Sequence, residues 1–316
     1  MPEIDISVVV PLYNEEESII RLYDSITEVM KGLNRSYEII FVDDGSSDET
    51  FERAKTIHEK DPYLKVIKFR KNYGQTPAMQ AGFDHAKGRT VVSMDGDLQN
   101  DPKDIPKFLE KIEEGYDIVC GWRKNRKDKL VSRKIPSKIA NRLIGQVTGV
   151  KIHDNGCSLK AYRSATIKKI RLYSEMHRFI PAMTSIVGIK YTEIVVNHHA
   201  RKFGTSKYGL SRIWKVFLDI FTVKMLVGFS TKPSLLFGML SLPFLIMGTM
   251  FMLFSINLYL NPFIFSSFPI IFPSISFLFI FLFVHMILLG MLSEMVLKTG
   301  DFKQKDIVKK VAIEVL

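Results

Sequence analysis

Short apolar runs alternate with amphipathic stretches over the first third of the chain. The runs are rich in Val, Ile and Phe and fall at residues 6–10, 37–42, 64–69, 90–94 and 117–121. Residues 16–30 and 48–59 repeat apolar positions at the spacings of three and four that are typical of amphipathic helices. Strands that alternate with helices predict an α/β domain, with a mostly parallel sheet covered by helices on both faces.

The last third of the chain has a different pattern. No Asp, Glu, Lys or Arg lies between Lys232 and Glu294. A bilayer core needs about 20 apolar residues per helix, so this stretch predicts two membrane-spanning helices, at residues 234–260 and 270–297. The turn between them is marked by Asn261, Pro262, Ser266, Ser267 and Pro269. The alternative is a buried helical hairpin in a soluble core, but core helices of this length usually carry a polar face.

Lysines flank the apolar pair and set its predicted orientation. They are Lys224 and Lys232 before the first helix, and Lys298, Lys303 and Lys305 after the second. Because loops rich in Lys and Arg stay on the cytoplasmic side, we expect both termini to be cytoplasmic. Residues 1–5 have neither a basic nor an apolar region, so we expect no signal peptide. The chain is therefore predicted to be an integral membrane protein.

Composition adds to this picture mainly through the distribution of charge. The 316 residues are 47% hydrophobic and have a net charge of +11. These values exclude a disordered chain, a collagen-like repeat and a small disulfide scaffold. Residues 1–119 contain 15 basic and 24 acidic residues, a net charge of −9. Residues 120–232 contain 24 basic and 5 acidic residues, a net charge of +19, and residues 233–316 contain 5 basic and 4 acidic residues, a net charge of +1. The basic middle region predicts contact with phosphate groups or anionic lipid.

The sequence has few residues for disulfides or soft metal sites. Cys120 and Cys157 are the two cysteines, and neither has zinc-ligand spacing. We therefore expect no disulfide framework and a reducing compartment. His153, His198 and His199 lie near basic motifs without metal-ligand spacing, so we expect structural histidines.

Polar clusters follow three of the predicted strands. They are residues 11–15 (PLYNE), 43–48 (DDGSSD) and 95–101 (DGDLQND). Ligands of such sheets bind beyond the carboxyl ends of the strands, so we expect the functional site there. Helix capping is a sufficient explanation for Asp48. It does not explain the carboxylate pairs Asp43–Asp44 and Asp95–Asp97.

Asp95 and Asp97 are the candidate metal ligands. Carboxylates two residues apart at a strand end can point the same way, and they repel each other unless a cation lies between them. Hard oxygen ligands suit Mg²⁺ or Mn²⁺, which also bind substrate phosphates, and Gln99 offers a further neutral oxygen. An isolated Asp-x-Asp is common in turns, so the weight of this pattern comes from its place after a strand and from the two companion clusters.

These three clusters resemble, in order and spacing, the motifs of the family 2 glycosyltransferases, whose nucleotide-sugar domain has the GT-A fold. Residues 95–102 (DGDLQNDP) resemble the form found in polyisoprenyl-phosphate glycosyltransferases, which include dolichol-phosphate mannose synthase and the bacterial bactoprenol glucosyltransferases. Residues 155–162 (NGCSLKAY), residues 199–208 (HARKFGTSKY) and the apolar C-terminal pair are similar to the same subfamily. The resemblance covers essentially the whole chain.

The resemblance implies a role for each matched residue. It implies nucleotide-sugar contacts for Pro11, Tyr13, Glu15, Val42, Asp44, Asp95, Gly96, Asp97, Gln99, Arg123, Arg201 and Lys207. Among these, Asp95, Asp97 and Gln99 would hold the metal and the diphosphate, and the three basic residues would grip phosphates. Catalytic roles are implied for Asp97 and Asp154. Trp122-Arg123 departs from the Ser-Arg common in relatives, which weakens the assignment of Arg123.

The implied activity is a metal-dependent, inverting transfer of a sugar to a polyprenyl phosphate at the cytoplasmic membrane face. Mg²⁺ or Mn²⁺ is the implied cofactor, UDP-glucose the favoured donor and undecaprenyl phosphate the favoured acceptor. A phosphate monoester is already largely an anion at neutral pH, so alignment and charge neutralisation matter more than a base. Asp154 is therefore either a base or a group that orients a sugar hydroxyl or helps to hold the metal.

Three alternatives have distinct signatures. A dolichol-phosphate-mannose-type synthase would use GDP-mannose. A processive membrane polysaccharide synthase usually has more membrane helices and a Gln-x-x-Arg-Trp motif, which this chain lacks. A scaffold that binds anionic lipid or nucleic acid is disfavoured by the carboxylate clusters, which repel phosphates without a metal, so we expect no nucleic-acid partner.

These patterns predict the organisation of the whole chain. We expect a cytoplasmic GT-A glycosyltransferase domain at residues 1–206, a juxtamembrane amphipathic helix at 207–232, two transmembrane helices within 233–298 and a cytoplasmic tail at 299–316. An apolar stripe among basic residues predicts an interfacial helix or, alternatively, a helix packed on the sheet; its members are Ile135, Ile139, Leu143 and Val147. The resemblance favours a bacterial plasma membrane and implies a homo-oligomer, although no sequence feature reveals a subunit interface.

Overall fold

The structure is a computed structural model that describes residues 4–124, 145, 149–170, 172, 176–185, 188–200, 232–260 and 270–299. The chain divides into two compact units, Met1–Lys224 and Met225–Leu316. Four predicted features lie outside the described residues: the apolar stripe at 135–147, residues 207–231 of the juxtamembrane helix, the turn at 261–269 and residues 300–316 of the tail. The predicted domain boundaries therefore stay predictions.

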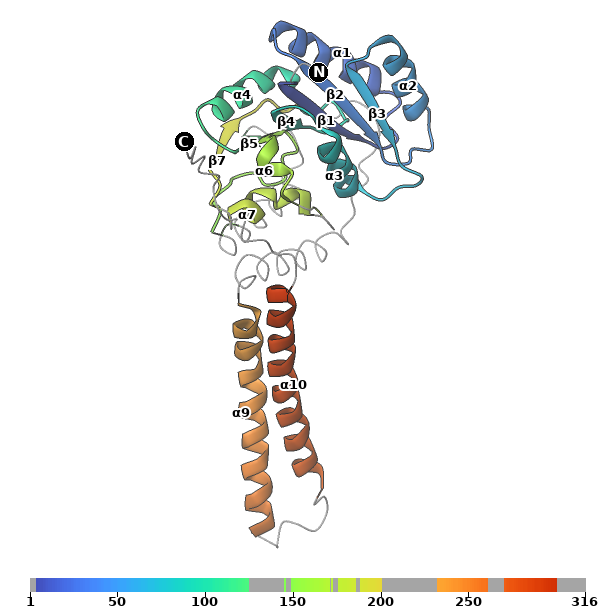
Figure 1. Cartoon of the computed structure of the whole chain (residues 1–316). Coiled ribbons are helices and arrows are strands. Elements are labelled where there is room, and N and C mark those ends of the chain that lie inside the picture. Colours follow the sequence, from blue (N-terminus) through green and yellow to red (C-terminus); the bar gives the residue numbers. More distant parts are fainter. Residues whose placement is uncertain are drawn as a thin grey trace. The chain divides into compact units, whose positions relative to one another are not determined.

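The first unit is built on a sheet of seven strands within the described residues, in the order β3-β2-β1-β4-β6-β5-β7 (Figure 1). The strands are β1 Ile6–Leu12, β2 Tyr37–Asp43, β3 Leu64–Lys68, β4 Thr90–Ser93, β5 Ile118–Trp122, β6 Lys160–Arg163 and β7 Tyr191–Val195. Strands β1 to β4 are parallel, and β5 is parallel to β7. Strand β6 runs antiparallel to both β4 and β5, so the sheet is mixed.

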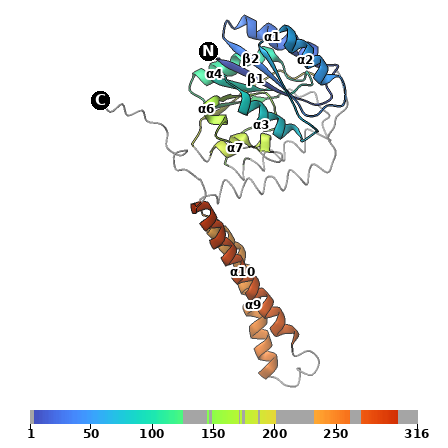
Figure 2. The ribbon, with the colours of Figure 1, turned by 45° about the vertical axis from the view of Figure 1, so that its right-hand side comes forward.

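Helices cover both faces of this sheet. They are α1 Ile19–Gly32, α2 Thr50–Lys60, α3 Gln75–His85, α4 Ile105–Glu113, α6 Ser164–Ile167 and α7 Ile180–Ser185, with the 3₁₀ turns η1 Pro102–Asp104 and η3 Met176–Arg178. Side chains of α1 and α4 pack on one face, against a hydrophobic cluster that includes Val8, Val10 and Phe41. Helix α3 lies on the opposite face from α1, α2 and α4 (Figures 1 and 2). Strand β2 is buried along its whole length, and its central residues 39–42 form a continuous apolar run.

The predicted α/β class is confirmed, and the five predicted strands are present with ends that differ by one or two residues. Strand β1 continues through Pro11 to Leu12, and β2 continues to Asp43. The two helices predicted at 16–30 and 48–59 are α1 and α2. Strands β6 and β7 were not predicted. Both are short, and the pairing of β6 with β4 joins residues about 70 positions apart, which local patterning cannot show.

The second unit contains the predicted apolar pair, α9 Pro233–Leu260 and α10 Ile271–Thr299. The two helices lie side by side over most of their length (Figures 1 and 2). Ser276 Oγ of α10 donates a hydrogen bond of 2.8 Å to Gly248 O of α9, and the Phe244 and Phe279 rings stack with centroids 6.3 Å apart. Small residues and hydrogen bonds of this kind are typical contacts between membrane helices.

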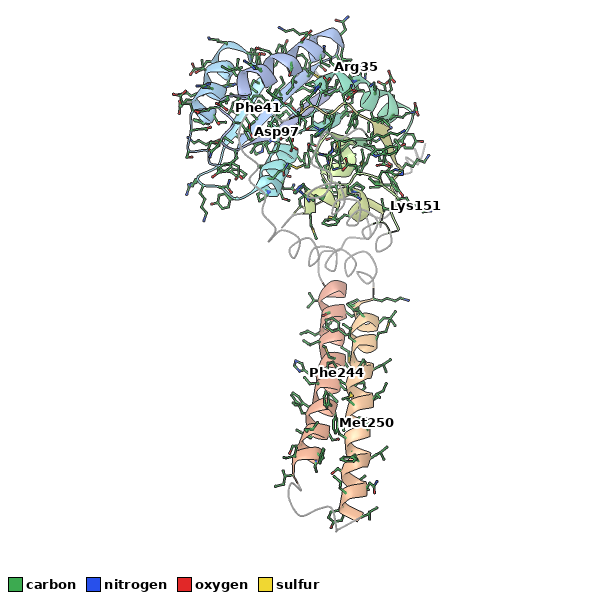
Figure 3. All side chains as sticks on the ribbon, turned by 180° about the vertical axis from the view of Figure 1, so that it is seen from behind. Arg35, Phe41, Asp97, Lys151, Phe244 and Met250 are labelled. Atoms are coloured by element: carbon green, nitrogen blue, oxygen red, sulfur yellow. The ribbon has the colours of Figure 1, made fainter. Side chains whose placement is uncertain are left out.

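Most other side chains of this pair face outward. Met250 of α9, labelled with Phe244 in Figure 3, is 53% exposed, and Phe277 of α10 is 73% exposed. Both helices are long and apolar enough to cross a membrane, judged by length and composition. Among the described residues these apolar surfaces are uncovered, which does not fit the alternative of a soluble core hairpin. Glu294, the acidic residue of the pair, accepts a hydrogen bond from Ser234 Oγ.

Candidate active site

The segments that follow β1 and β2 form one hydrogen-bonded unit at the carboxyl ends of the strands. Pro11 of β1 is paired in register with Val42 of β2, so the two segments leave the sheet at the same level. Asn14, with a φ of +51°, donates its N–H to Ser46 Oγ at 2.9 Å, and its side-chain oxygen accepts from Ser47 N at 2.9 Å. The two polar clusters predicted from sequence therefore meet, as the parallel sheet requires.

Asp44 joins a third segment to this unit. Its carboxylate accepts hydrogen bonds from the backbone N–H groups of Tyr73 at 2.7 Å and Gly74 at 2.8 Å, which lie just before α3. Burial, together with the neighbouring charge of Asp43, raises the pKa of Asp44 despite these two hydrogen bonds. Asp44 therefore holds the β3–α3 segment in place, a contact that the sequence did not indicate.

Residues 95–101, the carboxylate loop, follow β4. Asp95 Oδ1 accepts a hydrogen bond of 2.7 Å from Gln75 Nε2 of α3, and Asp97 Oδ1 accepts one of 3.1 Å from Gln99 N. Asp97 is 8% exposed. Leu98 has a φ of +60°, so the chain reverses directly after Asp97. Hydrogen bonds from both directions thus fix the two candidate metal ligands in one short loop.

The carboxylate loop packs directly against the segment after β1. Ser18 Oγ lies 3.0 Å from Gly96 O and 2.9 Å from Glu15 Oε2, within hydrogen-bonding distance of both. A Cβ at Gly96 would lie 2.5 Å from Leu12 Cδ2, so any larger residue would require the Leu12 side chain to shift. Glu15 and Gly96, which sequence reasoning assigned to the same nucleotide-sugar site, therefore lie in adjacent segments. Tyr13 is half-buried in the same region.

Arg123 and Asp154 form a buried ion pair on the β5 side of the site. Arg123 Nε lies 2.7 Å from Asp154 Oδ2, and Arg123 Nη2 lies 2.9 Å from Asp154 Oδ1. The two side chains are 10% and 5% exposed. Burial works against the guanidinium charge, but the hydrogen bonds to Asp154 outweigh it and raise the pKa of Arg123, with a further contribution from Asp95. The structure therefore brings together two residues that the sequence assigned to different roles.

Two residues that sequence reasoning missed hold the turn that carries Asp154. Glu193 Oε1 of β7 accepts a hydrogen bond of 2.8 Å from His153 N, and Glu193 Oε2 lies 2.7 Å from His153 Nδ1. Lys160 of β6 is 2% exposed, and its ammonium donates to Asn155 O at 3.1 Å and to Cys157 O. The NGCSLKAY motif contains Lys160, but its burial among carbonyl oxygens has no signature in sequence.

A further segment, residues 197–199, docks on the carboxylate loop. His199 N donates to Gln99 O at 2.9 Å, Gln99 Nε2 lies 3.4 Å from His199 O, and His199 Nε2 lies 3.1 Å from Asp101 Oδ2. Asn197 N donates to the buried Asp104 at 2.7 Å. His153 and His199 thus each lie within hydrogen-bonding distance of a carboxylate. Arg201 and Lys207 follow this segment in sequence and lie outside the described residues.

The donor set at the carboxylate loop is one of hard oxygens. Within the described part of the chain, no group of three or more His, Cys, Asp or Glu side chains is arranged for a metal. Mg²⁺ and Mn²⁺ often take one or two protein carboxylates and complete their shell with water and substrate phosphates. Asp95 and Asp97 fit a site of that kind. Cys120 and Cys157 are buried and free.

Comparison with known proteins identifies the family. Residues 7–171 match the family model described as glycosyl transferase family 2. The chain belongs to glycosyl transferase family 2. It is therefore a glycosyltransferase. The three polar clusters at the strand ends all lie within the matched residues.

Two curated relatives are close in sequence to this family 2 chain. A dodecaprenyl-phosphate galacturonate synthase of Rhizobium johnstonii is 43% identical over 304 residues, which cover 94% of this chain and 88% of the relative. An undecaprenyl-phosphate 4-deoxy-4-formamido-L-arabinose transferase of Salmonella choleraesuis is 41% identical over 218 residues, which cover 69% of this chain and 66% of the relative. The chain thus spans slightly under two thirds of the second relative.

Two solved structures share the fold of the first unit. Glucosyl-3-phosphoglycerate synthase from Mycobacterium tuberculosis, in complex with Mn²⁺, UDP and phosphoglyceric acid, aligns with a TM-score of 0.55 and 18% identity, covering 70% of this chain and 77% of that chain. TarS of S. aureus, in complex with UDP-GlcNAc, aligns with a TM-score of 0.51 and 20% identity, covering 71% and 67%. At these identities the likeness shows the fold alone, and it confirms the expected GT-A-like architecture.

Proposed function

We propose that this protein transfers a sugar from a nucleoside-diphosphate sugar to a polyprenyl phosphate at a membrane surface, with a divalent metal at the carboxylate loop. The observation that carries the proposal is the assembly of the carboxylate loop with the segments after β1 and β2 in a family 2 chain. The names of both close relatives specify a polyprenyl phosphate, which supports that acceptor class. The apolar helices α9 and α10 suit an enzyme with a lipid acceptor.

The names of the relatives change the expected sugar. UDP-glucose was favoured from sequence, but the two relatives are named for galacturonate and for 4-deoxy-4-formamido-L-arabinose. The neighbour named for a glucosyl product shares the fold at only 18% identity. We therefore propose a UDP-sugar donor whose sugar is a uronate, an amino-sugar derivative or glucose, and we rank the first two above glucose.

The chemistry needs little proton transfer. One oxygen of the acceptor phosphate forms a bond to the anomeric carbon, and the bond from that carbon to the nucleoside diphosphate breaks, with the electron pair leaving on the diphosphate. A phosphate monoester has a second pKa near ~6, so the attacking oxygen is already charged at neutral pH. A divalent ion held by Asp95 and Asp97 would supply charge stabilisation to the departing diphosphate. Arg123, held by Asp154, would neutralise further charge.

The nucleotide belongs to the segments after β1 and β2 in this proposal. Pro11 and Val42 lie at the ends of β1 and β2, Tyr13 and Glu15 follow β1, and Asp44 follows β2. Gln99 has its side-chain amide directed to His199 O, so any contribution to the metal would come from its amide oxygen. Arg201 and Lys207 are proposed to grip phosphates.

We also propose that the catalytic unit and both termini are cytoplasmic, in a bacterial plasma membrane. Lysines flank the apolar helices on their outer sides, which supports this orientation. The lipid-linked phosphate and the soluble nucleotide sugar would then meet at the inner leaflet. A homo-oligomer stays a prediction.

A donor screen tests the function. Purified full-length protein in detergent receives undecaprenyl phosphate, Mg²⁺ or Mn²⁺ and one labelled donor: UDP-galacturonate, UDP-4-deoxy-4-formamido-L-arabinose, UDP-glucose or GDP-mannose. We expect a single-sugar lipid product with a UDP-sugar. Transfer from GDP-mannose alone would contradict the UDP-sugar assignment, and a polymeric product would favour the processive alternative. Loss of the product on omitting the lipid phosphate is the control.

A further inference from the structure

We propose that Asp154 acts through Arg123 rather than as a general base. In this proposal Asp154 is a positioning residue: it fixes the Arg123 guanidinium as a preorganised cation for the diphosphate. Glu193 and Lys160 fix Asp154 in turn. This inference rests on the proposed function only in taking a diphosphate as the group that Arg123 meets.

The geometry of the ion pair carries the inference. Both Asp154 oxygens accept hydrogen bonds from the same guanidinium, at 2.7 Å and 2.9 Å, and Oδ2 also lies 3.4 Å from Arg123 N. A general base must present an oxygen to the proton that it removes. Asp154 instead makes the two parallel bonds of a bidentate pair, which sets both the place and the plane of its partner.

The turn around Asp154 is held from two strands of the sheet. Glu193 of β7 binds His153 through both of its carboxylate oxygens, and its Oε1 lies 3.4 Å from Asp154 N. Trp122, the residue before Arg123, stacks on the His153 ring with centroids 4.3 Å apart. The backbone that carries Asp154 and the backbone that carries Arg123 are thus fixed to each other as well as through their side chains.

Lys160 closes this arrangement from β6. Its buried ammonium binds the carbonyl oxygens of Asn155 and Cys157, so the turn after Asp154 is folded around it. A buried ammonium is costly unless its hydrogen bonds are satisfied. Replacing Lys160 with an apolar residue would leave two buried carbonyl groups without this donor and would loosen the turn.

The held guanidinium has donors to spare. A guanidinium carries five N–H groups, and the bonds to Asp154 use two of them. Asp95 of the carboxylate loop is among the charges that raise the pKa of Arg123. A cation held by a buried carboxylate needs no reorganisation when a diphosphate arrives, and such preorganisation is what makes fixed charges effective.

A double-mutant cycle tests this role without requiring the acceptor. The variants are Arg123→Ala, Asp154→Ala and the double variant, in the full chain, and the readout is calorimetric binding of UDP with Mn²⁺. We expect each single change to weaken UDP binding at least tenfold. The double variant should then bind within about threefold of the weaker single variant, because residues that act as a unit are strongly non-additive. The proposal would be overturned if the loss of UDP affinity in the double variant equalled the product of the two single losses. Unchanged UDP binding in Asp154→Ala would overturn it as well.

Asp154→Asn separates positioning from base catalysis, using transfer to undecaprenyl phosphate from the best donor of the screen. Positioning predicts that UDP affinity and turnover fall together, and that Glu193→Gln and Lys160→Met reduce both in the same direction. Lost turnover with intact UDP binding in Asp154→Asn would identify a base and refute positioning. Matched controls are Lys111→Ala, Glu114→Ala and their double variant, which remove an exposed ion pair at the end of α4. These should leave UDP binding unchanged.

Thermal melting of every variant in this set identifies any that fail to fold. If Asp154→Ala does not fold, the Asp154→Asn comparison decides the question. The positioning role of Asp154 and the proposed function can be rejected separately. Absence of transfer by the wild type would reject the polyprenyl phosphate acceptor, whereas the UDP–Mn²⁺ cycle would still support or reject the Asp154–Arg123 relationship.

Discussion

Substituting Gly45 tests how tightly the segment after β2 is packed against the segment before α3. Gly45 has a φ of +69°, and a Cβ there would lie 2.4 Å from Lys71 C and 2.7 Å from Asn72 N. These are backbone atoms, so no side-chain rotation relieves the overlap. Gly45→Ala must therefore separate the two segments, and with them the contacts of Asp44 to Tyr73 and Gly74.

A second glycine isolates the steric part of the effect. Gly188 has a φ of +70° with nothing within 4 Å of a built Cβ. Gly188→Ala is expected to cost about 1–2 kcal/mol, the usual penalty for a left-handed non-glycine residue. Gly45→Ala should add about 1–3 kcal/mol for overpacking. At roughly 2–4 °C per kcal/mol for a unit of this size, the two melting temperatures should differ by about 2–12 °C.

The assay is thermal unfolding of the full chain in detergent, followed by calorimetric UDP–Mn²⁺ binding. Gly32→Ala, at the end of α1 with open space around it, is the neutral control. We expect Gly45→Ala to bind UDP more weakly and Gly188→Ala to bind it normally. Equal losses of melting temperature in Gly45→Ala and Gly188→Ala would refute the packing argument, because the overlap is the difference between the two sites.

Three further predictions follow from other parts of the chain. Burial opposes the charge of Glu38, but hydrogen bonds from Lys65, Ser7 and Lys87 lower its pKa below the ordinary 4.5. The charged Glu38 side chain therefore stabilises the fold above its ordinary pKa of 4.5, and this stabilisation is lost as the pH falls through the lowered pKa of the folded protein. Glu38→Gln should lower the free energy of unfolding, measured by urea denaturation, by about 1–3 kcal/mol at pH 7 and by less at pH 4. Equal losses at the two pH values would contradict this prediction. Burial raises the pKa of Cys120 to about 12 and of Cys157 to about 11, so neither should react with a thiol reagent at pH 8 until the protein unfolds; rapid labelling of the folded chain would oppose this. Alkaline phosphatase fused within residues 261–269 should be active in cells and fused after Leu316 inactive; the reverse pattern would reject the proposed orientation.

The elements that sequence patterns predict correctly are those with strong local signals. Strands β1 and β2 are buried and mostly apolar, and the polar residues at their ends mark one edge of the sheet. The apolar stretch after Lys232 likewise predicts α9 and α10. In each case the signal lies within a few consecutive residues, where burial or a bilayer dictates the residue types.

The parts that were missed depend on long-range pairing. Strand β6 has the sequence KAYR, whose first residue is a buried lysine, and it runs antiparallel between two strands of the opposite direction. Arg123 and Asp154 are 31 residues apart, and Glu193 is 39 residues beyond Asp154. Sequence spacing carries no information about such partners, because the folded sheet alone decides which side chains meet.

Metal-dependent transfer to undecaprenyl phosphate, compared between the wild type and Asp97→Ala, tests the central claim most directly. Asp97 lies in the carboxylate loop and is labelled in Figure 3, and Asp24→Ala, an exposed carboxylate of α1, is the matched control. With the best UDP-sugar of the screen, the wild type and Asp24→Ala should form a single-sugar lipid product that chelation with EDTA abolishes and Mn²⁺ or Mg²⁺ restores. Asp97→Ala should lose at least a hundredfold in turnover, a typical loss when a group that stabilises transition-state charge is removed. Full turnover by Asp97→Ala, or transfer that persists in EDTA, would contradict a metal-assisted transferase built on the carboxylate loop.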